Sequence, residues 1–506
     1  MTRHLVLTGF MGAGKSSAAR RLAEKLGRRC VDSDELLELH FGRSLERVFE
    51  EEGEATFRAA EAAEIARQLD GEEPLVLALG GGALENSQTR ELLAKHLVIY
   101  LEISANAAWR RVKGSKRPLA QDRDQFVALL DERRPQYERT AHLTIQNEPR
   151  NAPAAAAEFI GELLLRPSDT RALWAATQSW QYPAVFERGL VRRHDLFTVK
   201  GNFTTLSDTN LARQHDWLRF GVVIEPGETS KTLTELERVC SQFAERGLTR
   251  QDSIVAVGGG VVGDLAGFAA AVYQRGIDVI QVPTSLVAQV DSAYGGKTGV
   301  DLPSAKNYVG AYHQPQAVLV DVEALTTLPQ AELAAGYAEV IKTALIAGGS
   351  LWEAVEMGID LTEAFPAEIV FGCAKAKLNI VVQDERDGGR RQVLNLGHTI
   401  GHAIETAAGY GRMRHGEAVG IGLLGALRLS GLDGLHERVK GLLEDAGLPT
   451  TALGLETETV LEFLHLDKKR TGGDVPFVLV AAPGEVTHGH LVPQSQVRSA
   501  IEELLQ

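Results

Sequence analysis

The chain has 506 residues, of which 44% are hydrophobic and 24% charged, and its formal net charge is −14. At roughly 150 residues per domain, this length predicts about three domains. No apolar run approaches the roughly 20 residues of a membrane-spanning helix, which argues against a membrane protein. The negative charge disfavours nucleic acid and anionic membranes as partners and favours small molecules.

The first ten residues, MTRHLVLTGF, lead directly into an apolar strand and a glycine turn. They lack the h-region and cleavage site of a signal peptide, so we expect a cytosolic protein. Three distant cysteines, Cys30, Cys240 and Cys373, offer neither a disulfide framework nor a cysteine-based zinc site. If the chain binds phosphates, clustered Lys, Arg and backbone N–H groups must overcome its negative charge locally.

Short apolar runs at residues 4–8, 75–79 and 97–101 are separated by long amphipathic stretches. This alternation is typical of parallel strands joined by helical crossovers, and an Ala-rich helical segment near 152–165 closes this first α/β unit. The polar turn that follows predicts a linker at about 166–172. Residues 170–180 resist assignment.

A second α/β pattern follows, and after Pro329 the strand signal largely stops. Strands are predicted near 195–199, 221–224, 253–257, 278–282 and 317–321, and helices near 231–246 and 263–273. Residues 330–465 are predicted to be mostly helical. We therefore predict three domains, at residues 1–168, 173–328 and 329–506.

Residues Gly9 to Ser16, GFMGAGKS, match the phosphate-loop pattern G-x-x-x-x-G-K-[ST] between a predicted strand and a predicted helix. In such a loop the backbone N–H groups cradle phosphates, Lys15 supplies a charge to the β/γ oxygens and Ser16 can ligate Mg²⁺. A glycine turn that binds no nucleotide is the alternative.

Several polar residues further along could serve an acceptor substrate. Asp32 and Asp34 could hold the metal's waters and a substrate hydroxyl, or could instead cap a helix. Arginines and a glycine loop add anion-binding capacity, although each arginine taken singly could be a solvated surface charge. These are Arg58, Arg117, Arg133 and the loop at 80–82.

With its motifs in this order, the segment 1–165 resembles shikimate kinase. The resemblance implies a nucleoside-monophosphate-kinase-like fold that phosphorylates shikimate with ATP and Mg²⁺. Asp32 would then lie near the metal and Asp34 would orient the acceptor hydroxyl. Arg58, Gly82 and Arg133 would hold the acid substrate, and Arg117 would be a lid arginine. The ATP and Mg²⁺ contacts would come from Gly12, Ala13, Gly14, Lys15, Ser16, Ser17 and Arg117, with Ser16 as the metal ligand.

A second glycine motif follows the strand predicted at 253–257. Gly258 to Asp264, GGGVVGD, contains G-x-G-x-x-G before a predicted helix. This pattern suggests a dinucleotide pyrophosphate at the helix N-terminus, although a glycine-rich turn without a ligand shows the same pattern.

Histidines suggest a metal site in the second part. His398 and His402 are four residues apart, and His415 follows. Thr399 stands where the zinc-protease motif H-E-x-x-H has Glu, so that interpretation fails. Imidazoles with one carboxylate could let Zn²⁺ polarise a substrate hydroxyl, or the histidines could simply cap or pack helices. Several lysines in glycine-rich or apolar surroundings favour a phosphorylated, carboxylated substrate, although each could also lie on the surface.

Together these motifs make residues 180–506 similar to 3-dehydroquinate synthase. The resemblance implies NAD⁺ and a divalent metal, usually zinc or another such as Co²⁺. It implies conversion of 3-deoxy-D-arabino-heptulosonate 7-phosphate to 3-dehydroquinate and phosphate. Glu339, His398 and His415 would bind the metal. The NAD-contacting positions would be Asp208, Asn210, Glu228, Lys231, Gly260, Val261, Val262, Gly263, Asp264, Thr284, Ser285, Lys297 and Lys306.

The same resemblance implies a set of substrate and catalytic positions, in which His402 is the candidate for proton transfer. They are Arg275, Asp291, Lys297, Lys306, Asn307, Lys342, Lys377, Arg391, Asn395, His402 and Lys468. Among these, Lys297, Lys342, Arg391, Asn395 and His402 are predicted to be catalytic, as are Lys15, Asp34 and Arg117 in the first part. Asp387 departs from the usual Glu and could loosen a substrate contact.

We therefore predict a fused bifunctional enzyme of aromatic precursor biosynthesis. Its fold class would be α/β: a phosphate-loop kinase with helices on both faces of a parallel sheet, then an NAD-binding domain and a helical metal-binding domain. The two reactions are not consecutive, so direct handover is not expected. Alternatives are another sugar-phosphate cyclase, an alcohol dehydrogenase, or one catalytically dead half. The synthase resemblance also suggests a homodimer.

Overall fold

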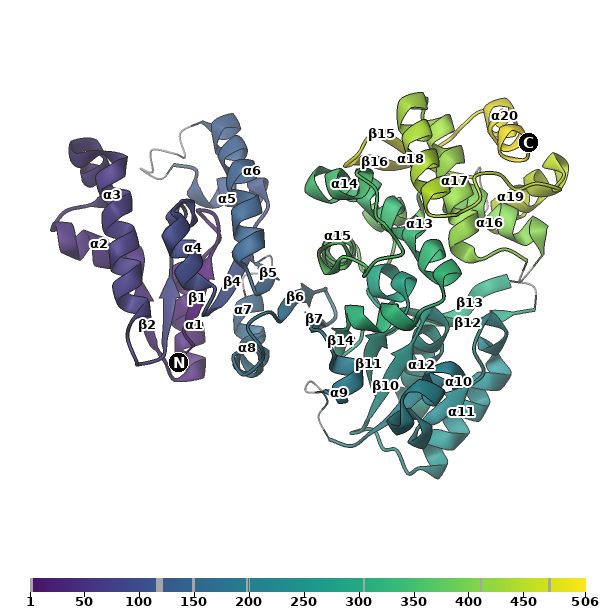
Figure 1. The fold of residues 1–506 in the computed structure, drawn as a ribbon, viewed down its shortest axis with the longest axis horizontal. Helices are drawn as coiled ribbons and strands as arrows, with labels where there is room; N and C mark the ends of the chain where they lie inside the picture. Colours follow the sequence, from purple (N-terminus) through teal and green to yellow (C-terminus); the bar gives the residue numbers. More distant parts are fainter. Residues whose placement is uncertain are drawn as a thin grey trace. The chain divides into compact units, whose positions relative to one another are not determined.

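The computed structural model describes residues 3–114, 122–147, 151–196, 199, 201–303, 305–409, 412–471 and 475–506, with side chains omitted for 465–471. The chain divides into two compact units, Met1–Glu187 and Arg188–Gln506 (Figure 1). Each unit contains parallel strands and helices, and the second also has a largely helical part. The predicted α/β fold class is confirmed.

A parallel sheet forms the centre of the first unit. Its strands are β1 (Leu5–Thr8), β2 (Arg29–Asp32), β3 (Leu75–Ala78), β4 (Leu97–Glu102) and β5 (Leu143–Gln146), in the order β2-β3-β1-β4-β5. All four residues of β1 are buried, as expected of a strand covered on both faces. The apolar runs predicted as strands are confirmed.

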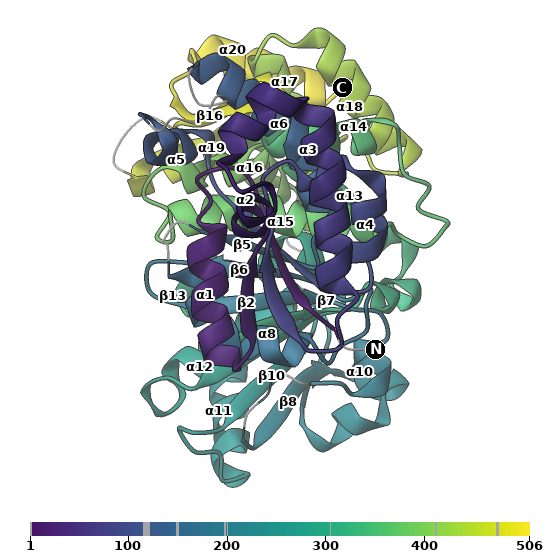
Figure 2. The same cartoon turned by 90° about the vertical axis from the view of Figure 1, so that its left-hand side faces the viewer.

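Helices cover both faces of this sheet. Figure 2 shows α1 (Lys15–Leu26) to one side of the strands, and α3 (Leu45–Leu69) and α4 (Ser87–Leu93) to the other. The remaining elements are α2 (Ser33–Phe41), the short turn η1 (Ala83–Glu85), α5 (Ala105–Val112), α6 (Arg123–Thr140), α7 (Ala152–Ala155) and α8 (Ala157–Leu163).

The linker predicted at about 166–172 is instead ordered structure of the first unit. Strand β6 (Arg171–Ala176) pairs parallel to β5, and β7 (Gln181–Phe186) returns antiparallel to β6. Arg166 Nη2 lies 2.6 Å from an oxygen of the buried Glu187, and this ion pair anchors the polar turn that begins at Arg166. The run of β6, RALWAA, has three alanines, which are depleted in strands, and no β-branched residue, so it gave no strand signal.

A second parallel sheet carries the first part of the second unit. Its order is β14-β11-β10-β8-β9, from β8 (Phe203–Asp208), β9 (Val222–Ile224), β10 (Ser253–Gly258), β11 (Asp278–Pro283) and β14 (Ala317–Val320). The strand predicted near 195–199 is wrong where the structure describes it, since the first strand is β8. Phe197 and Thr198 of the predicted stretch lie outside the described residues.

Helices and a hairpin complete this part. They are α9 (Leu190–Arg193), α10 (Thr209–Gln214), η3 (Asp216–Phe220), η4 (Glu228–Ser230), α11 (Leu233–Glu245), α12 (Gly260–Val272), η5 (Tyr273–Arg275), the π-helical turn η6 (Ala288–Ser292), the hairpin β12 (Lys297–Leu302) and β13 (Ala305–Tyr312), and η7 (Val322–Thr327). The core lies where α11 and α12 cover the sheet.

The predicted helical part begins with α13 (Gln330–Ala347). It continues through α14 (Gly349–Glu356), α15 (Ala367–Gln383), η8 (Arg390–Asn395), α16 (His398–Ala408), α17 (His415–Leu429), α18 (Asp433–Asp445), α19 (Thr457–Thr471), the hairpin β15 (Phe477–Ala482) and β16 (Glu485–His490), and α20 (Gln494–Leu504). Glycines let three of these helices touch. A Cβ on Gly416 of α17 would lie 1.9 Å from the carbonyl oxygen of Ala335 on α13. A Cβ on Gly422, also of α17, would lie 2.0 Å from the carbonyl oxygen of Gly397, the residue before α16.

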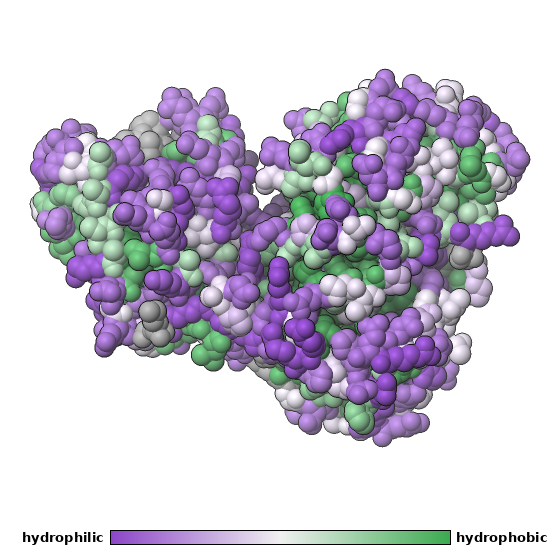
Figure 3. All heavy atoms as spheres, viewed as in Figure 1, coloured by the Kyte–Doolittle hydropathy of each residue, from purple (hydrophilic) through white to green (hydrophobic). Residues whose placement is uncertain are grey.

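Hydrophilic residues cover most of the face of each unit that Figure 3 shows. Among the described helices, none combines the length and apolar character required to cross a membrane.

Three histidines of the first unit accept hydrogen bonds from backbone N–H groups near the starts of strands. The Nδ1 atom of His4 accepts from Leu75 N at 3.4 Å, that of His96 from His4 N at 3.3 Å, and that of His142 from Val98 N at 3.2 Å. An imidazole protonated at Nδ1 cannot accept such a bond. Burial is the main cause that lowers the pKa of both His96 and His142 to about 4.

We expect acid to destabilise the first unit between about pH 6.5 and pH 4. In this window the unfolded chain binds protons at His96 and His142 that the folded chain does not, so the free energy of unfolding falls as the pH falls. The loss is on the order of 3 kcal/mol for each histidine. Hydrogen exchange of amides in β1, β3 and β4, corrected for its intrinsic pH dependence, measures it. The variant His142→Gln, which keeps an acceptor but does not titrate, should show a shallower dependence. Protection in the wild type that is constant from pH 7 to 4.5 would contradict this account.

Candidate active sites in the two units

The phosphate-loop motif of the first unit lies between β1 and α1, as predicted. Gly12 and Gly14 have φ angles of 81° and 88°, which disfavour other residues. Lys15 curls over the loop and donates from Nζ to the carbonyl oxygens of Gly9 at 2.8 Å and Phe10 at 3.3 Å. Because α1 begins at Lys15, its first N–H groups are free of intrahelical partners and form an anion-binding terminus.

Two residues that sequence reasoning missed hold this loop. Arg111 donates to the carbonyl oxygens of Gly12 at 3.0 Å and Asn147 at 3.2 Å, and the Asn147 amide donates to Ala13. Both lie far along the chain from the motif, so no local pattern marks them. Of the predicted contacts, Ser16 is half-buried and Ser17 is exposed.

Two carboxylates meet over Gly80, on the loop that follows β3. A Cβ at Gly80 would lie 2.8 Å from Asp34 Oδ1 and 2.5 Å from Glu61 Oε1. Asp32 Oδ1 accepts the backbone N–H of Asp34 at 3.0 Å and caps α2, so the helix-capping alternative holds for Asp32. Asp34 is thereby placed beside the glycine loop. Burial is the main cause that raises the pKa of Glu61, and Arg58 opposes it.

The structure brings Arg58, Gly82 and Arg133 together from α3, the glycine loop and α6. A Cβ at Gly82 would lie 2.2 Å from Arg58 Nη2, so the loop backbone lies directly against the guanidinium. Glu61 Oε2 is 2.7 Å from Arg58 Nη1. Glu85, which sequence reasoning missed, forms ion pairs with both arginines. Arg117 lies outside the described residues.

A cavity of about 1630 Å³ occupies the second unit, and most of the predicted synthase residues line it. These are Asp208, Asn210, Glu228, Lys231, Gly260, Val261, Val262, Asp264, Thr284, Ser285, Asp291, Lys297, Lys306, Asn307, Glu339, His398, His402 and His415. Six predicted residues are not in its lining: Gly263, Arg275, Lys342, Lys377, Arg391 and Asn395. The side chain of Lys468 lies outside the described part of the chain.

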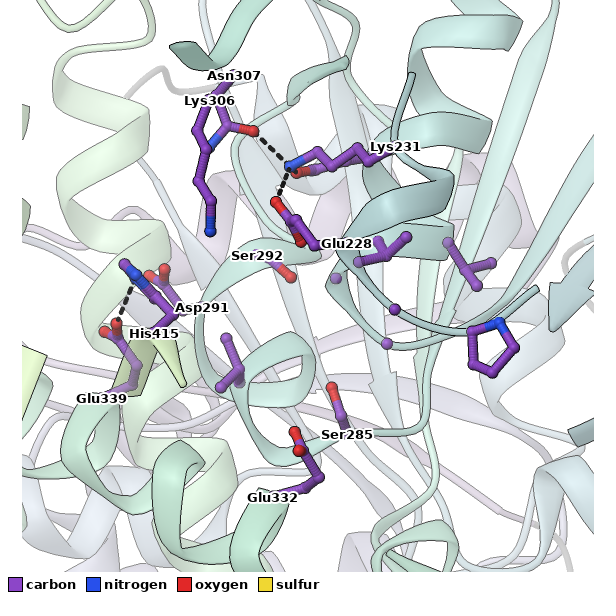
Figure 4. A pocket seen from close by; sticks show the side chains of 18 of the residues that line it. Glu228, Lys231, Ser285, Asp291, Ser292, Lys306, Asn307, Glu332, Glu339 and His415 are labelled. Atoms are coloured by element: carbon purple, nitrogen blue, oxygen red, sulfur yellow. Dashed lines mark hydrogen bonds and ion pairs between the residues drawn. The ribbon is translucent and has the colours of Figure 1, made fainter. Parts of the chain in front are cut away.

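One end of the cavity is formed by the glycine turn between β10 and α12. Lys231 is buried there, with its Nζ 2.6 Å from Asp264 Oδ2 and 3.8 Å from Glu228 Oε1. It also donates to Asn307 on β13, and Figure 4 shows Lys231 between Glu228 and Asn307. Burial alone would lower the pKa of Lys231, but the two carboxylates outweigh it and raise it. The glycine backbone that lines this end of the cavity suits a pyrophosphate.

At the other end, Glu339, His398 and His415 meet from α13, α16 and α17. Glu339 Oε1 lies 3.6 Å from His398 Nε2 and 3.5 Å from His415 Nε2, and Figure 4 shows Glu339 beside His415. Tetrahedral bonds of 2.0–2.1 Å would place ligand atoms about 3.3 Å apart, so a divalent metal fits between these atoms. His398 Nδ1 lies 3.2 Å from Leu396 O, and His415 Nδ1 lies 3.2 Å from Glu405 Oε2. These two contacts orient both rings so that their Nε2 atoms face Glu339.

The charges of these side chains also suit a cation. Burial is the main cause that lowers the pKa of His398 to about 3. Burial would raise the pKa of Glu339, but Lys342 and the histidines outweigh it and hold the pKa well below its usual range. Burial would lower the pKa of His415, but Glu339 and Glu405 raise it to about 9. Glu339 is therefore ionised and His398 is neutral, as metal ligands must be, whereas His415 must release a proton to bind a metal.

Two predicted residues outside the lining contact acidic residues that line the cavity. Lys377 Nζ is 2.8 Å from Asp291 Oδ1, and Lys342 Nζ lies 3.8 Å from the same oxygen and 2.5 Å from Glu339 Oε2. Arg391 is buried and donates to backbone carbonyl oxygens, including that of Gly295 at 3.0 Å. Its role toward the substrate stays a prediction.

Other predicted residues differ in their placement. His402 is exposed, and one of its ring nitrogens lies within 4.8 Å of a ring nitrogen of His398 and of His415. Asn395 is exposed away from the cavity lining, and Arg275 has a left-handed φ of 67° at the end of η5. Asp387 ion-pairs with Lys297, so the shorter acid reaches a predicted site residue.

Glu405 is the main functional candidate of this unit that sequence reasoning missed. It is buried, accepts from Lys306 Nζ at 2.6 Å and contacts His415 as described. It follows His402 by three residues, one helical turn along α16, so the helical spacing could have found it.

Comparisons with known proteins agree with the two-part division. The family model of shikimate kinase matches residues 11–164, and those of the 3-dehydroquinate synthase N-terminal and C-terminal parts match 221–335 and 336–470. A 3-dehydroquinate synthase of Acidithiobacillus ferrooxidans is 40% identical over 349 residues, which cover 64% of this chain and 96% of that protein.

Solved structures of related synthases also resemble the second unit of the chain. A 2-deoxy-scyllo-inosose synthase complexed with carbaglucose-6-phosphate, NAD⁺ and Co²⁺ is 25% identical with a TM-score of 0.58, covering 66% of this chain and all of that one. A 2-epi-5-epi-valiolone synthase from Streptomyces hygroscopicus with NAD⁺ and Zn²⁺ bound shares the fold at 24% identity and a TM-score of 0.60, covering 65% and 98%.

We expect Gly82→Ala to weaken the affinity of the first unit for a carboxylate substrate by about tenfold or more, because the added methyl must displace the Arg58 guanidinium. Calorimetric titration with shikimate measures this. The control is Gly81→Ala, whose Cβ would meet its nearest atom at 3.7 Å. Equal losses in both variants would mean that the Arg58 contact is not responsible.

Proposed function

The chain belongs to the 3-dehydroquinate synthase family through its second unit and to the shikimate kinase family through its first, and from this premise we propose how its residues carry the two reactions. It is a bifunctional enzyme of the shikimate pathway, which leads to chorismate and the aromatic amino acids. One unit phosphorylates shikimate with ATP, and the other converts the heptulosonate phosphate to 3-dehydroquinate with release of phosphate.

The observation that carries the synthase assignment is the meeting of Glu339, His398 and His415 at one end of a cavity whose other end is a glycine-rich turn. The three side chains are a donor set for a divalent metal, and the glycine-rich turn suits a dinucleotide. The alternative of a different sugar-phosphate cyclase is less well supported, because identity is 40% to a dehydroquinate synthase and 25% to an inosose synthase.

In the kinase unit, ATP with Mg²⁺ supplies the phosphoryl group. We propose that the N–H groups of the loop and of the first turn of α1 bind its phosphates, with Ser16 as the Mg²⁺ ligand. Lys15 would exchange the carbonyl oxygens of Gly9 and Phe10 for phosphate oxygens. Asp34 would orient the acceptor hydroxyl, and Arg58 and Arg133 would bind the carboxylate of shikimate. Arg117 stays a predicted lid residue.

In the synthase unit, a bound Zn²⁺ or Co²⁺ supplies Lewis acidity and NAD⁺ supplies reversible hydride transfer. We propose that Glu339, His398 and His415 hold the metal, while the turn at Gly260 and the Lys231–Asp264 pair position NAD⁺. No step of this proposal requires the two units to exchange a product.

The other polar residues of the cavity would act on the substrate. Lys297, Lys306 and Asn307 lie along the β12–β13 hairpin, where they can bind phosphate or carboxylate oxygens. Asp291 would be oriented by Lys377, whose pKa burial lowers to about 8. His402 would transfer a proton at its exposed imidazole. We also propose a homodimer through this unit and a cytosolic location, as family membership suggests.

We expect Lys15→Ala to abolish shikimate phosphorylation and leave dehydroquinate formation unchanged, and His398→Ala to do the reverse, each with a loss of more than about 100-fold. The reason is that each residue serves one unit and its ligands. Phosphate release from the heptulosonate phosphate and ATP-dependent shikimate phosphorylation, measured on the same preparations, test this. Loss of both activities in either variant would contradict independent sites.

We expect Glu405→Gln to weaken metal binding by about 10- to 100-fold, because the carboxylate holds His415 with its Nε2 toward Glu339. Competition for Zn²⁺ with a chelator and the absorption spectrum of the Co²⁺ form measure this without reference to activity. Glu332→Gln is the matched control, since Glu332 also lines the cavity but ion-pairs with Arg414. Unchanged affinity in Glu405→Gln would show that Glu405 does not position the ligand.

A further inference from the structure

Glu85 contacts both arginines that we assign to the substrate carboxylate of the kinase unit. It lies in η1, directly after the glycine loop. One of its carboxylate oxygens, Oε2, is 3.6 Å from Arg58 Nε, and the other, Oε1, ion-pairs with Arg133 Nη2. The arginines come from α3 and α6, which are far apart in the sequence. A single carboxylate therefore lies between two guanidinium groups, which is the arrangement expected of a bound carboxylate ligand.

Burial shows which partner in this cluster can leave. The side chains of Arg133 and Arg58 are 9% and 19% exposed, whereas that of Glu85 is 38% exposed. Glu61, which also pairs with Arg58, has a side chain that is 3% exposed and lies on the same helix, α3. The arginines and Glu61 are thus fixed by packing, while the Glu85 side chain has solvent to move into.

The charge of the cluster also requires one carboxylate to leave. Arg58 and Arg133 supply two positive charges, and Glu54, Glu61 and Glu85 already face them with three carboxylates. A further carboxylate from the substrate would meet like charges in a partly desolvated site, which is unfavourable. The side chain of Glu54 is 62% exposed and ion-pairs with Arg58. It does not occupy the position between the two arginines, where Glu85 lies.

We propose that Glu85 is an internal competitor for the substrate: its carboxylate occupies the position between Arg58 and Arg133 and must swing out before an anionic substrate binds. This inference rests on the proposed role of the two arginines. Glu85 lowers the affinity for every carboxylate by the same factor, about three- to tenfold. Ligands with further contacts, such as those of the shikimate hydroxyls, still displace it, whereas simple carboxylic acids are held more weakly.

Removal of the charge at Glu85 tests the proposal. We expect Glu85→Gln and Glu85→Ala to bind shikimate about three- to tenfold more tightly, with a matching fall in its KM and an unchanged KM for ATP. The control is Glu54→Gln, which removes a carboxylate from Arg58 alone and should change affinity less than twofold. Shikimate methyl ester, which lacks the carboxylate charge, should gain nothing in any variant. Weaker binding, or unchanged binding, of shikimate in both Glu85 variants would overturn the competition.

Arg133→Gln separates this proposal from the function on which it rests. If Arg133 binds the substrate carboxylate, that variant loses shikimate affinity by about tenfold or more. Unchanged affinity there would refute the substrate role of the arginine pair. A loss in Arg133→Gln without a gain in the Glu85 variants would leave the kinase site as proposed and refute only the competition by Glu85.

Discussion

Close approach of one backbone to another, at positions where only glycine fits, is the constraint on which the synthase site depends. Gly416 lets α17 lie against α13, and Gly422 lets it lie against the turn before α16, where a Cβ would come within 2.0 Å of a carbonyl oxygen. These two contacts set the spacing of three helices. That spacing brings Glu339, His398 and His415 within the reach of one ion.

In both units the polar site residues have partners within the chain. Lys15 donates to carbonyl oxygens of its own loop, and Glu85 lies between two arginines. His415 lies between Glu339 and Glu405. Buried charges without partners are costly, so these contacts stabilise the charged groups of both sites.

Residues within a local motif were predictable, whereas those that support the motif from afar were not. The phosphate loop, the glycine turn before α12 and the two histidines at the start of α16 follow from spacing along a single strand–turn–helix or helix. Arg111 and Asn147 reach the phosphate loop from other elements, and Glu85 reaches Arg133 from a different one. The buried strand β6 was missed because its sequence, RALWAA, is rich in alanine and has no β-branched residue, a composition that does not favour strands.

By itself, the sequence determined the two-part organisation, the α/β class and a set of candidate site residues, because these depend on motifs of short range. Only the tertiary structure decided which of the candidates lie together. It placed Arg391 among backbone carbonyl oxygens outside the cavity lining, Lys342 against Glu339, and Glu405 against His415. The physical reason is that distances between side chains on different helices are set by packing, which no local pattern records.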